Sequence, residues 1–96
     1  MAETIDEITI NFIDQETAVQ VVKELEKEIL TRGAWTTIIF RYQQWEPAKE
    51  AYSPDHYTIR RYQKKDGSYS QKSKFNISNK EQAGKLAEIL LRWSKD

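Results

Sequence analysis

The stretch YTIRRYQKKDGSYSQKSKFNIS, residues 57–78, decides how the rest of the chain is interpreted. Two runs rich in β-branched and aromatic residues flank the dipeptide Asp66-Gly67. An Asp-Gly dipeptide between such runs is the strongest short signal of a β-hairpin. The same stretch mixes lysines and arginines with aromatic residues, so it predicts a basic hairpin and raises the question of what that hairpin contacts.

Upstream of the hairpin the sequence predicts a strand, a helix and a second strand. Residues 8–12 (ITINF) alternate and are β-rich, and residues 34–45 (AWTTIIFRYQQW) are rich in β-branched and aromatic residues. Between them, Asp14 is placed to cap a helix over residues 14–30, and Gly33 to end it. The predicted helix has an apolar stripe at helical spacing, formed by Ala18, Val21, Val22, Leu25 and Ile29.

Downstream of the hairpin the sequence predicts a second helix, from Asn79 to about Ser94. Ser78 and Glu81 have the spacing of a capping box at its start. Its apolar side comprises Ala83, Leu86, Ala87, Leu90 and Trp93. The element order is therefore β-α-β-β-β-α, and we predict an α+β fold: an antiparallel sheet with two helices packed on one face.

Composition limits the class of protein. Ninety-six residues form one domain, residues 1–96. The chain has no cysteine, which excludes disulfides and cysteine-ligated zinc. No apolar run approaches the ~20 residues of a membrane span, and residues 1–10 lack the basic and apolar regions of a signal peptide. We therefore expect a cytoplasmic protein with no membrane partner.

The formal net charge of zero conceals two halves of opposite sign. Residues 1–31 contain eight acids and two bases, whereas residues 32–96 contain thirteen bases and seven acids. The sequence thus predicts an acidic β-α unit over residues 1–33 and a basic β-β-β-α unit over residues 34–96. This asymmetry argues against a uniformly basic nucleic-acid-binding protein and permits a local basic patch.

Strand alternation predicts which side chains share a face. If the helices cover a face formed by Phe75, Ile59 and Phe40, the cations and several aromatics lie together on the open face. Cations neutralise phosphates and aromatic rings stack on bases, which is what a single strand of DNA or RNA requires. The predicted nucleic-acid-binding residues on that face, where Trp45 also lies, are Trp35, Arg41, Arg60, Tyr62, Lys64, Lys72 and Lys74.

Catalytic and metal-binding patterns are weak. His56, beside Asp55, has no cysteine, second histidine or obvious nucleophile to act with. Glu24 and Glu28 lie four residues apart, but two carboxylates do not make a dedicated cation site. The glycines are scattered and form no phosphate-binding loop. We predict a protein that is not an enzyme and uses no metal or cofactor.

Residues 59–90 also carry a family resemblance. The sequence IRRYQKKDGSYSQKSK followed by NKEQAGKLAEIL resembles the end of the DNA-binding domain of the transcriptional positive cofactor four family. The matching positions are Ile59, Arg60, Tyr62, Gly67, Lys74, Glu81 and Gln82. The resemblance implies a curved antiparallel sheet backed by helices, a homodimer, binding of single-stranded DNA and a transcription-related role.

The chain departs from this family at two places. Lys74-Phe75-Asn76-Ile77-Ser78 stands where the family has Lys-Gly-Ile-Ser-Leu, which shifts the apolar phase by one residue, and Ala83 replaces the tryptophan of the family's helix. The run from Lys64 to Ala83 is also similar to arm-type DNA-binding domains of phage integrases. Residues 14–94 follow the element order of double-stranded-RNA-binding domains.

The leading prediction from the sequence is a small protein that binds single-stranded nucleic acid, DNA foremost, as a homodimer. Independently of the resemblance, Trp93 near the C-terminus has little chain left to cover it, which favours self-association. The alternatives are that the basic hairpin is only a solvated face, or that the chain is a protein–protein interaction module with no nucleic-acid ligand. Salt dependence separates phosphate binding from apolar docking.

Overall fold

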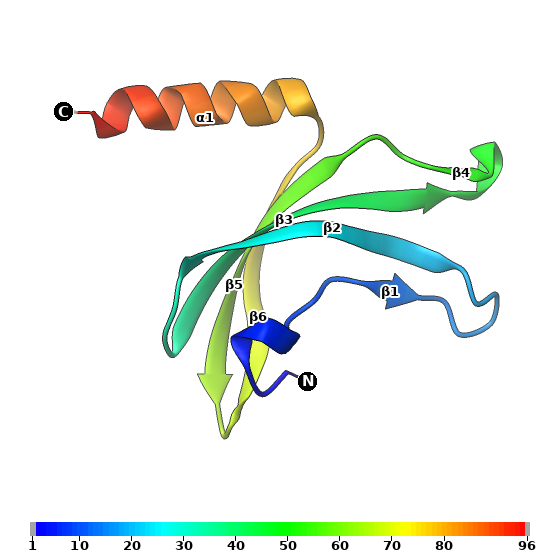
Figure 1. Ribbon diagram of the computed structural model, residues 1–96, viewed down its shortest axis with the longest axis horizontal. Coiled ribbons are helices and arrows are strands. Elements are labelled where there is room, and N and C mark those ends of the chain that lie inside the picture. Colours follow the sequence, from blue (N-terminus) through cyan, green and yellow to red (C-terminus); the bar gives the residue numbers. More distant parts are fainter. Residues whose placement is uncertain (1, 96) are drawn as a thin grey trace.

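The computed structural model describes residues 2–95 and has an antiparallel sheet that curls into a half-barrel (Figure 1). Five strands lie in the order β1-β2-β3-β5-β6, and a short strand, β4 (Ala51–Tyr52), pairs with β3 outside this order. The five are β1 (Phe12–Ile13), β2 (Gln20–Thr31), β3 (Trp35–Glu46), β5 (His56–Lys65) and β6 (Ser68–Ile77). One α-helix, α1 (Lys80–Ser94), follows among the described residues, so the α+β class is confirmed.

The helix predicted over residues 14–30 is wrong, because β2 occupies most of that range. The Asp14 carboxylate does accept the amides of Glu16 and Thr17, at 2.8 and 3.3 Å, as a helix cap would. Ala18 then adopts a left-handed conformation (φ 61°), and the Asp14 amide donates to the Val19 carbonyl at 2.9 Å. The chain therefore reverses into a β1–β2 hairpin, and the unit 1–33 is not β-α.

The apolar stripe of this segment resembled a helix because β2 is bulged. Val22 faces Gln44 and Ile29 faces Ile38, so both lie on the same side of the sheet although they are an odd number of residues apart. The register shift between Glu24 and Glu26, which lies between these two residues, makes this possible. Seven residues is also two helical turns, so the same spacing fits both structures.

The β5–β6 hairpin is confirmed. Asp66 and Gly67 have φ values of 53° and 82°, as a two-residue turn with both central residues left-handed requires, and Lys65 pairs with Ser68 across it. A bulge shifts the register between Arg61 and Tyr62, opposite Lys72.

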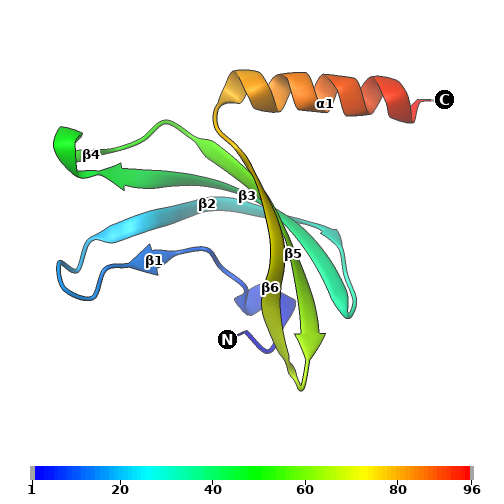
Figure 2. The same ribbon diagram turned by 180° about the vertical axis from the view of Figure 1, so that it is seen from behind.

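The concave face of the half-barrel is covered by the N-terminal segment, not by a helix (Figures 1 and 2). We name residues 2–11 the N-terminal strap; it contains η1 (Ile5–Glu7). Its side chains pack with those of β3, β5 and β6 in a core of Ile8, Ile10, Ile38, Phe40, Tyr42, Tyr62 and Tyr69. The strand predicted over residues 8–12 is displaced, since only Phe12 and Ile13 belong to β1.

Side chains of β2 hold the strap in place. Lys27 Nζ donates to the carbonyls of Ile5, Asp6 and Ile8 at 2.9, 3.2 and 2.7 Å. Glu24 Oε1 accepts from the Thr9 hydroxyl at 2.8 Å and from the Ile10 amide at 3.3 Å. Residues 5–10 of the strap are therefore attached to β2 by side-chain hydrogen bonds, where a sheet would ordinarily use backbone hydrogen bonds between strands.

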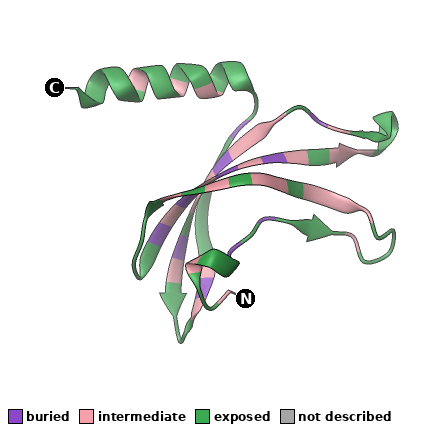
Figure 3. Ribbon diagram, in the orientation of Figure 1, coloured by how far each residue is buried: buried purple, intermediate pink, exposed green. Residues whose placement is uncertain are grey.

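Helix α1 is predicted almost to the residue, but its cap and its packing differ. Asn79 is the N-cap and accepts the Gln82 amide at 2.8 Å, and the Gln82 side chain accepts the Ser78 amide at 2.9 Å. The N-cap is thus Asn79, one residue later than predicted, and the predicted Ser78–Glu81 capping box is wrong. None of the described residues of α1 is buried, and Figure 3 shows the helix largely exposed beyond the sheet. The prediction that two helices pack on one face of the sheet is therefore wrong.

Candidate nucleic-acid interface

The strand pairing fixes the two faces of the sheet. Ile39 pairs with Ile59 and Ile59 with Phe75, so these three share the convex face. Phe40 instead pairs with Thr58 on the concave face. The predicted grouping of Phe40 with Ile59 and Phe75 is therefore wrong by one residue. The side chains that share a face within each strand were predicted correctly. The register between β3 and β5 was not, because a long loop joins these strands and the sequence does not define how they pair.

This register divides the predicted site residues between two faces. Trp35 and Arg41 lie on the convex face, and Lys72 lies at the bulge of β6. On the concave face are Arg60, Tyr62, Lys64 and Lys74. The seven residues therefore do not form one surface.

The concave residues are partly used by the core. Tyr62 is only 6% exposed, and burial raises the pKa of its phenol, so its ring is not open to a base. Arg60 Nη1 donates to Gln71 at 3.0 Å, and Lys64 Nζ lies 5.5 Å from the centre of the Tyr69 ring. These contacts stabilise the hairpin and leave no accessible aromatic ring among the predicted concave residues.

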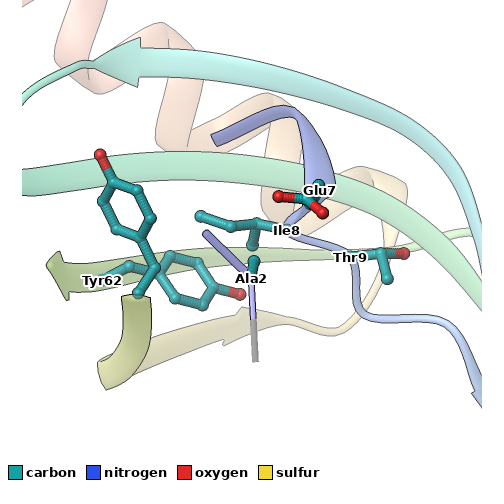
Figure 4. Close-up of a pocket in the computed structure, with 6 residues that line it drawn as sticks. Ala2, Glu7, Ile8, Thr9 and Tyr62 are labelled. Atoms are coloured by element: carbon teal, nitrogen blue, oxygen red, sulfur yellow. The ribbon is translucent and has the colours of Figure 1, made fainter. Parts of the chain in front are cut away.

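A hollow of about 440 Å³ lies between the strap and the hairpin on this side (Figure 4). Its walls are Ala2, Glu7, Ile8 and Thr9 from the strap and Tyr62 and Tyr69 from the hairpin. The Thr4 hydroxyl and amide donate to the Glu7 carboxylate and hold its pKa below the ordinary value. The Glu7 carboxylate, the one acid among the described residues in the wall of the hollow, is therefore already hydrogen-bonded within the strap.

Arg41 is committed to ion pairs. It contacts Glu26 of β2 and, at 3.0 Å, Asp55 of the loop before β5. Gln43 Nε2 also donates to Asp55 at 3.1 Å. Burial opposes the ionisation of Asp55, but the hydrogen bonds from Gln43 and Arg41 outweigh it and lower its pKa. Arg41 thus joins three parts of the fold and is poorly placed to bind a phosphate.

The structure assembles a different set of residues around the outer side of the hairpin. The Arg61 guanidinium lies 4.5 Å from the centre of the Trp35 ring, a cation–π contact on the convex face. Trp35 is 44% exposed and Phe75, on the same face, is 57% exposed. Lys72, at the bulge, and Lys74, on the concave face, both lie on β6 at the edge of the sheet, and both are exposed. We name these residues the hairpin surface: Trp35, Arg61, Lys72, Lys74 and Phe75.

Two members of this surface were missed by the sequence reasoning. Arg61 alternates with Arg60, so it belongs to the opposite face, and Phe75 was assigned to the covered side. Successive residues of β5 point to opposite faces. Once the convex face is known to be uncovered, this alternation identifies Arg61 as a candidate binding residue.

Other types of site have less support. Among residues 2–95, no group of three or more histidine, cysteine, aspartate or glutamate side chains is placed to hold a metal. In the same range, no helix is long and apolar enough to cross a membrane. Comparisons of the chain with protein-family models, with curated proteins and with solved structures find no match.

Proposed function

We propose that the chain binds single-stranded nucleic acid, DNA foremost, through the hairpin surface. The observation that supports this most is the Arg61–Trp35 cation–π contact, with the exposed ring of Phe75 farther along the same face. These groups lie on the most basic part of the chain, where the hairpin from His56 to Ile77 contains Asp66 as its one acid.

In this proposal the aromatic and cationic groups have separate tasks. Trp35 and Phe75 stack on bases, each contributing about 1–3 kcal/mol, with little discrimination because every base has an aromatic face. Arg61, Lys72 and Lys74 neutralise phosphates and release counterions. The chain acts by binding, without a cofactor or a chemical step. A transcription-related role rests on the family resemblance alone.

Substitutions separate the two tasks in a titration of a labelled oligo-dT. Trp35→Ala and Phe75→Ala are expected to cost about 1–3 kcal/mol each and to leave the salt dependence unchanged. Lys72→Ala and Lys74→Ala are expected to reduce the slope of log K against log salt by about 0.7 each. Lys23→Ala, at an exposed lysine of β2, is the matched control and is expected to bind normally. Normal binding by all four variants would remove the hairpin surface from the proposal.

The second candidate is a protein-interaction module, and it is favoured by a different observation. Leu90, Leu91 and Trp93 of α1 are 52%, 59% and 68% exposed, which is an unusual density of large apolar groups on one helix. An apolar surface of this kind docks protein, and its affinity responds little to salt. The homodimer expected from the sequence would use such a surface, and the two functions are compatible in one chain.

A further inference from the structure

Helix α1 is bonded to the sheet at its start and packs on little of it. The Asn79 and Gln82 side chains bond across the helix start, and His56 Nδ1 lies 2.6 Å from the Ser78 carbonyl oxygen. The 15-residue helix runs on the convex side and beyond the sheet, as both views show (Figures 1 and 2). Isolated helices of about 12–15 residues are marginal in water, so α1 needs a packing partner to be stable.

The convex face has a niche that such a partner can fill. The niche measures about 170 Å³ and lies where the bulge of β2 alters its pairing with β3. Its lining includes Ile39, Phe40, Tyr57 and the Arg41 side chain, with Glu26 and Glu28 at the β2 side. A cavity of about 150 Å³ holds a benzene ring, so the niche has the size of an aromatic side chain.

The end of α1 matches this niche in shape and charge. Trp93 is the most exposed of the large apolar residues, at 68%. It is flanked by two cations, Arg92 and Lys95. The niche is lined by two acids, Glu26 and Glu28, and by Arg41 and Lys27, and Lys27 Nζ is already bonded to carbonyls of the strap. Since Glu26 already pairs with Arg41, Glu28 is the acid best placed to meet Arg92.

We propose that Trp93 of one copy inserts into the β2–β3 niche of a second copy, and that the second copy does the same in return. A two-fold dimer of this type uses the same contact twice, so each apolar helix end is covered and each niche is filled. The contact joins the basic C-terminal part of one chain to the acidic N-terminal part of the other, in agreement with the charge asymmetry of the sequence.

The proposed contact lies on the convex face mainly at β2 and β3, whereas most of the hairpin surface lies along β5 and β6, with Trp35 at the start of β3. Ile39, Ile59 and Phe75 face one another on three neighbouring strands. Ile39 lines the niche, and Phe75 lies two strands from it, a separation of about 10 Å. The Trp93 contact itself therefore does not overlap Phe75. The inference does not depend on nucleic-acid binding, and it is tested without nucleic acid.

Sedimentation equilibrium of the full chain measures the dimer directly. We expect a monomer–dimer equilibrium, and we expect Trp93→Ala to weaken it at least about tenfold, because a buried tryptophan anchor dominates an interface. Trp35→Ala replaces another exposed tryptophan of the same protein, outside the niche, and is expected to leave association unchanged. A monomer at all protein concentrations, or a dimer that is insensitive to Trp93→Ala, would overturn the proposal.

A charge exchange identifies the occupant of the niche. Glu28→Arg and Arg92→Glu each place like charges together twice in a homodimer, and each is expected to weaken association about fivefold. When the two variants are mixed in equal amounts, the mixed dimer has opposite charges at both contacts and is expected to regain wild-type affinity. If the mixture stays as weak as its components, another occupant fills the niche and the proposal fails.

Discussion

At the scale of single residues, the Arg41–Asp55 pair connects β3 to the loop that precedes β5. Glu26 and Gln43 complete the cluster, so one arginine and one aspartate link β2, β3 and that loop. Because the folded state lowers the pKa of Asp55, ionised Asp55 favours folding. Its contribution is fully present above the unfolded pKa of about 3.9 and is lost as the pH falls through the lower folded value.

We predict that Asp55→Asn reduces stability at neutral pH by about 1–3 kcal/mol, because a charge-assisted pair is lost. The variant is also expected to lose less stability than wild type between pH 5 and about pH 2. Thermal unfolding followed from neutral pH down to about pH 2 measures both effects. Asp66→Asn is the control, since asparagine suits the left-handed turn position equally well. Parallel acid profiles for wild type and Asp55→Asn would contradict the assignment.

Asn79 caps the N-terminus of α1. Asn79→Ala removes the acceptor for the Gln82 amide and is expected to cost the helix about 0.5–2 kcal/mol. Because the described residues of α1 are not buried, the loss is expected in the helical circular-dichroism signal and not in the melting of the sheet. Ser78→Ala, the adjacent substitution, keeps the backbone contacts of that residue and is expected to change little. Equal losses for both variants would contradict the cap at Asn79.

At the scale of elements, the N-terminal strap supplies the second layer that a sheet needs. Ile8 and Ile10 are 4% and 7% exposed, and they cover the concave side chains of β3. The strap depends on Lys27 and Glu24 of β2, since side chains replace a continuous backbone ladder along most of it. An element held in this way is stable only while those side chains are intact.

We predict that Lys27→Met destabilises the fold by about 1–3 kcal/mol, because three strap carbonyls lose their donor. Amide hydrogen exchange is expected to accelerate in residues 5–10 before it does in β3. Lys23→Met, at an exposed lysine of the same strand, is the control and is expected to leave strap protection unchanged. Unchanged exchange in the Lys27→Met strap would show that the lysine does not anchor it.

At the scale of the whole molecule, the chain is less compact than its length suggests. Its Cα radius of gyration is 15.2 Å, whereas a compact domain of about 100 residues has roughly 13 Å. The projecting helix and the uncovered convex face account for this difference (Figure 3). The dimer proposed above would cover the end of the helix and the β2–β3 part of the convex face.

How far the sequence predicts this molecule depends on whether a signal is local. The Asp66-Gly67 hairpin and α1 follow from turn chemistry and helical spacing within a few residues. The structure of β2 and the face pairing of β3 with β5 depend on bulges and on a long loop, which leave no short-range pattern. Because the pairing of β3 with β5 could not be predicted, the predicted site was divided between two faces. Trp35, Lys72 and Lys74 remain candidates for binding. Tyr62 lies in the core instead, and Arg61 was not predicted.

The proposed binding of a single strand is tested by a titration of the wild-type chain. Tryptophan fluorescence is followed as oligo-dT, oligo-rU and a duplex are added at two salt concentrations. We predict that a single strand quenches the fluorescence, that its affinity falls steeply with salt, and that the duplex binds more weakly because its bases are not free to stack. Absence of binding to either single strand at low salt would contradict the account and leave the basic hairpin as a solvated face.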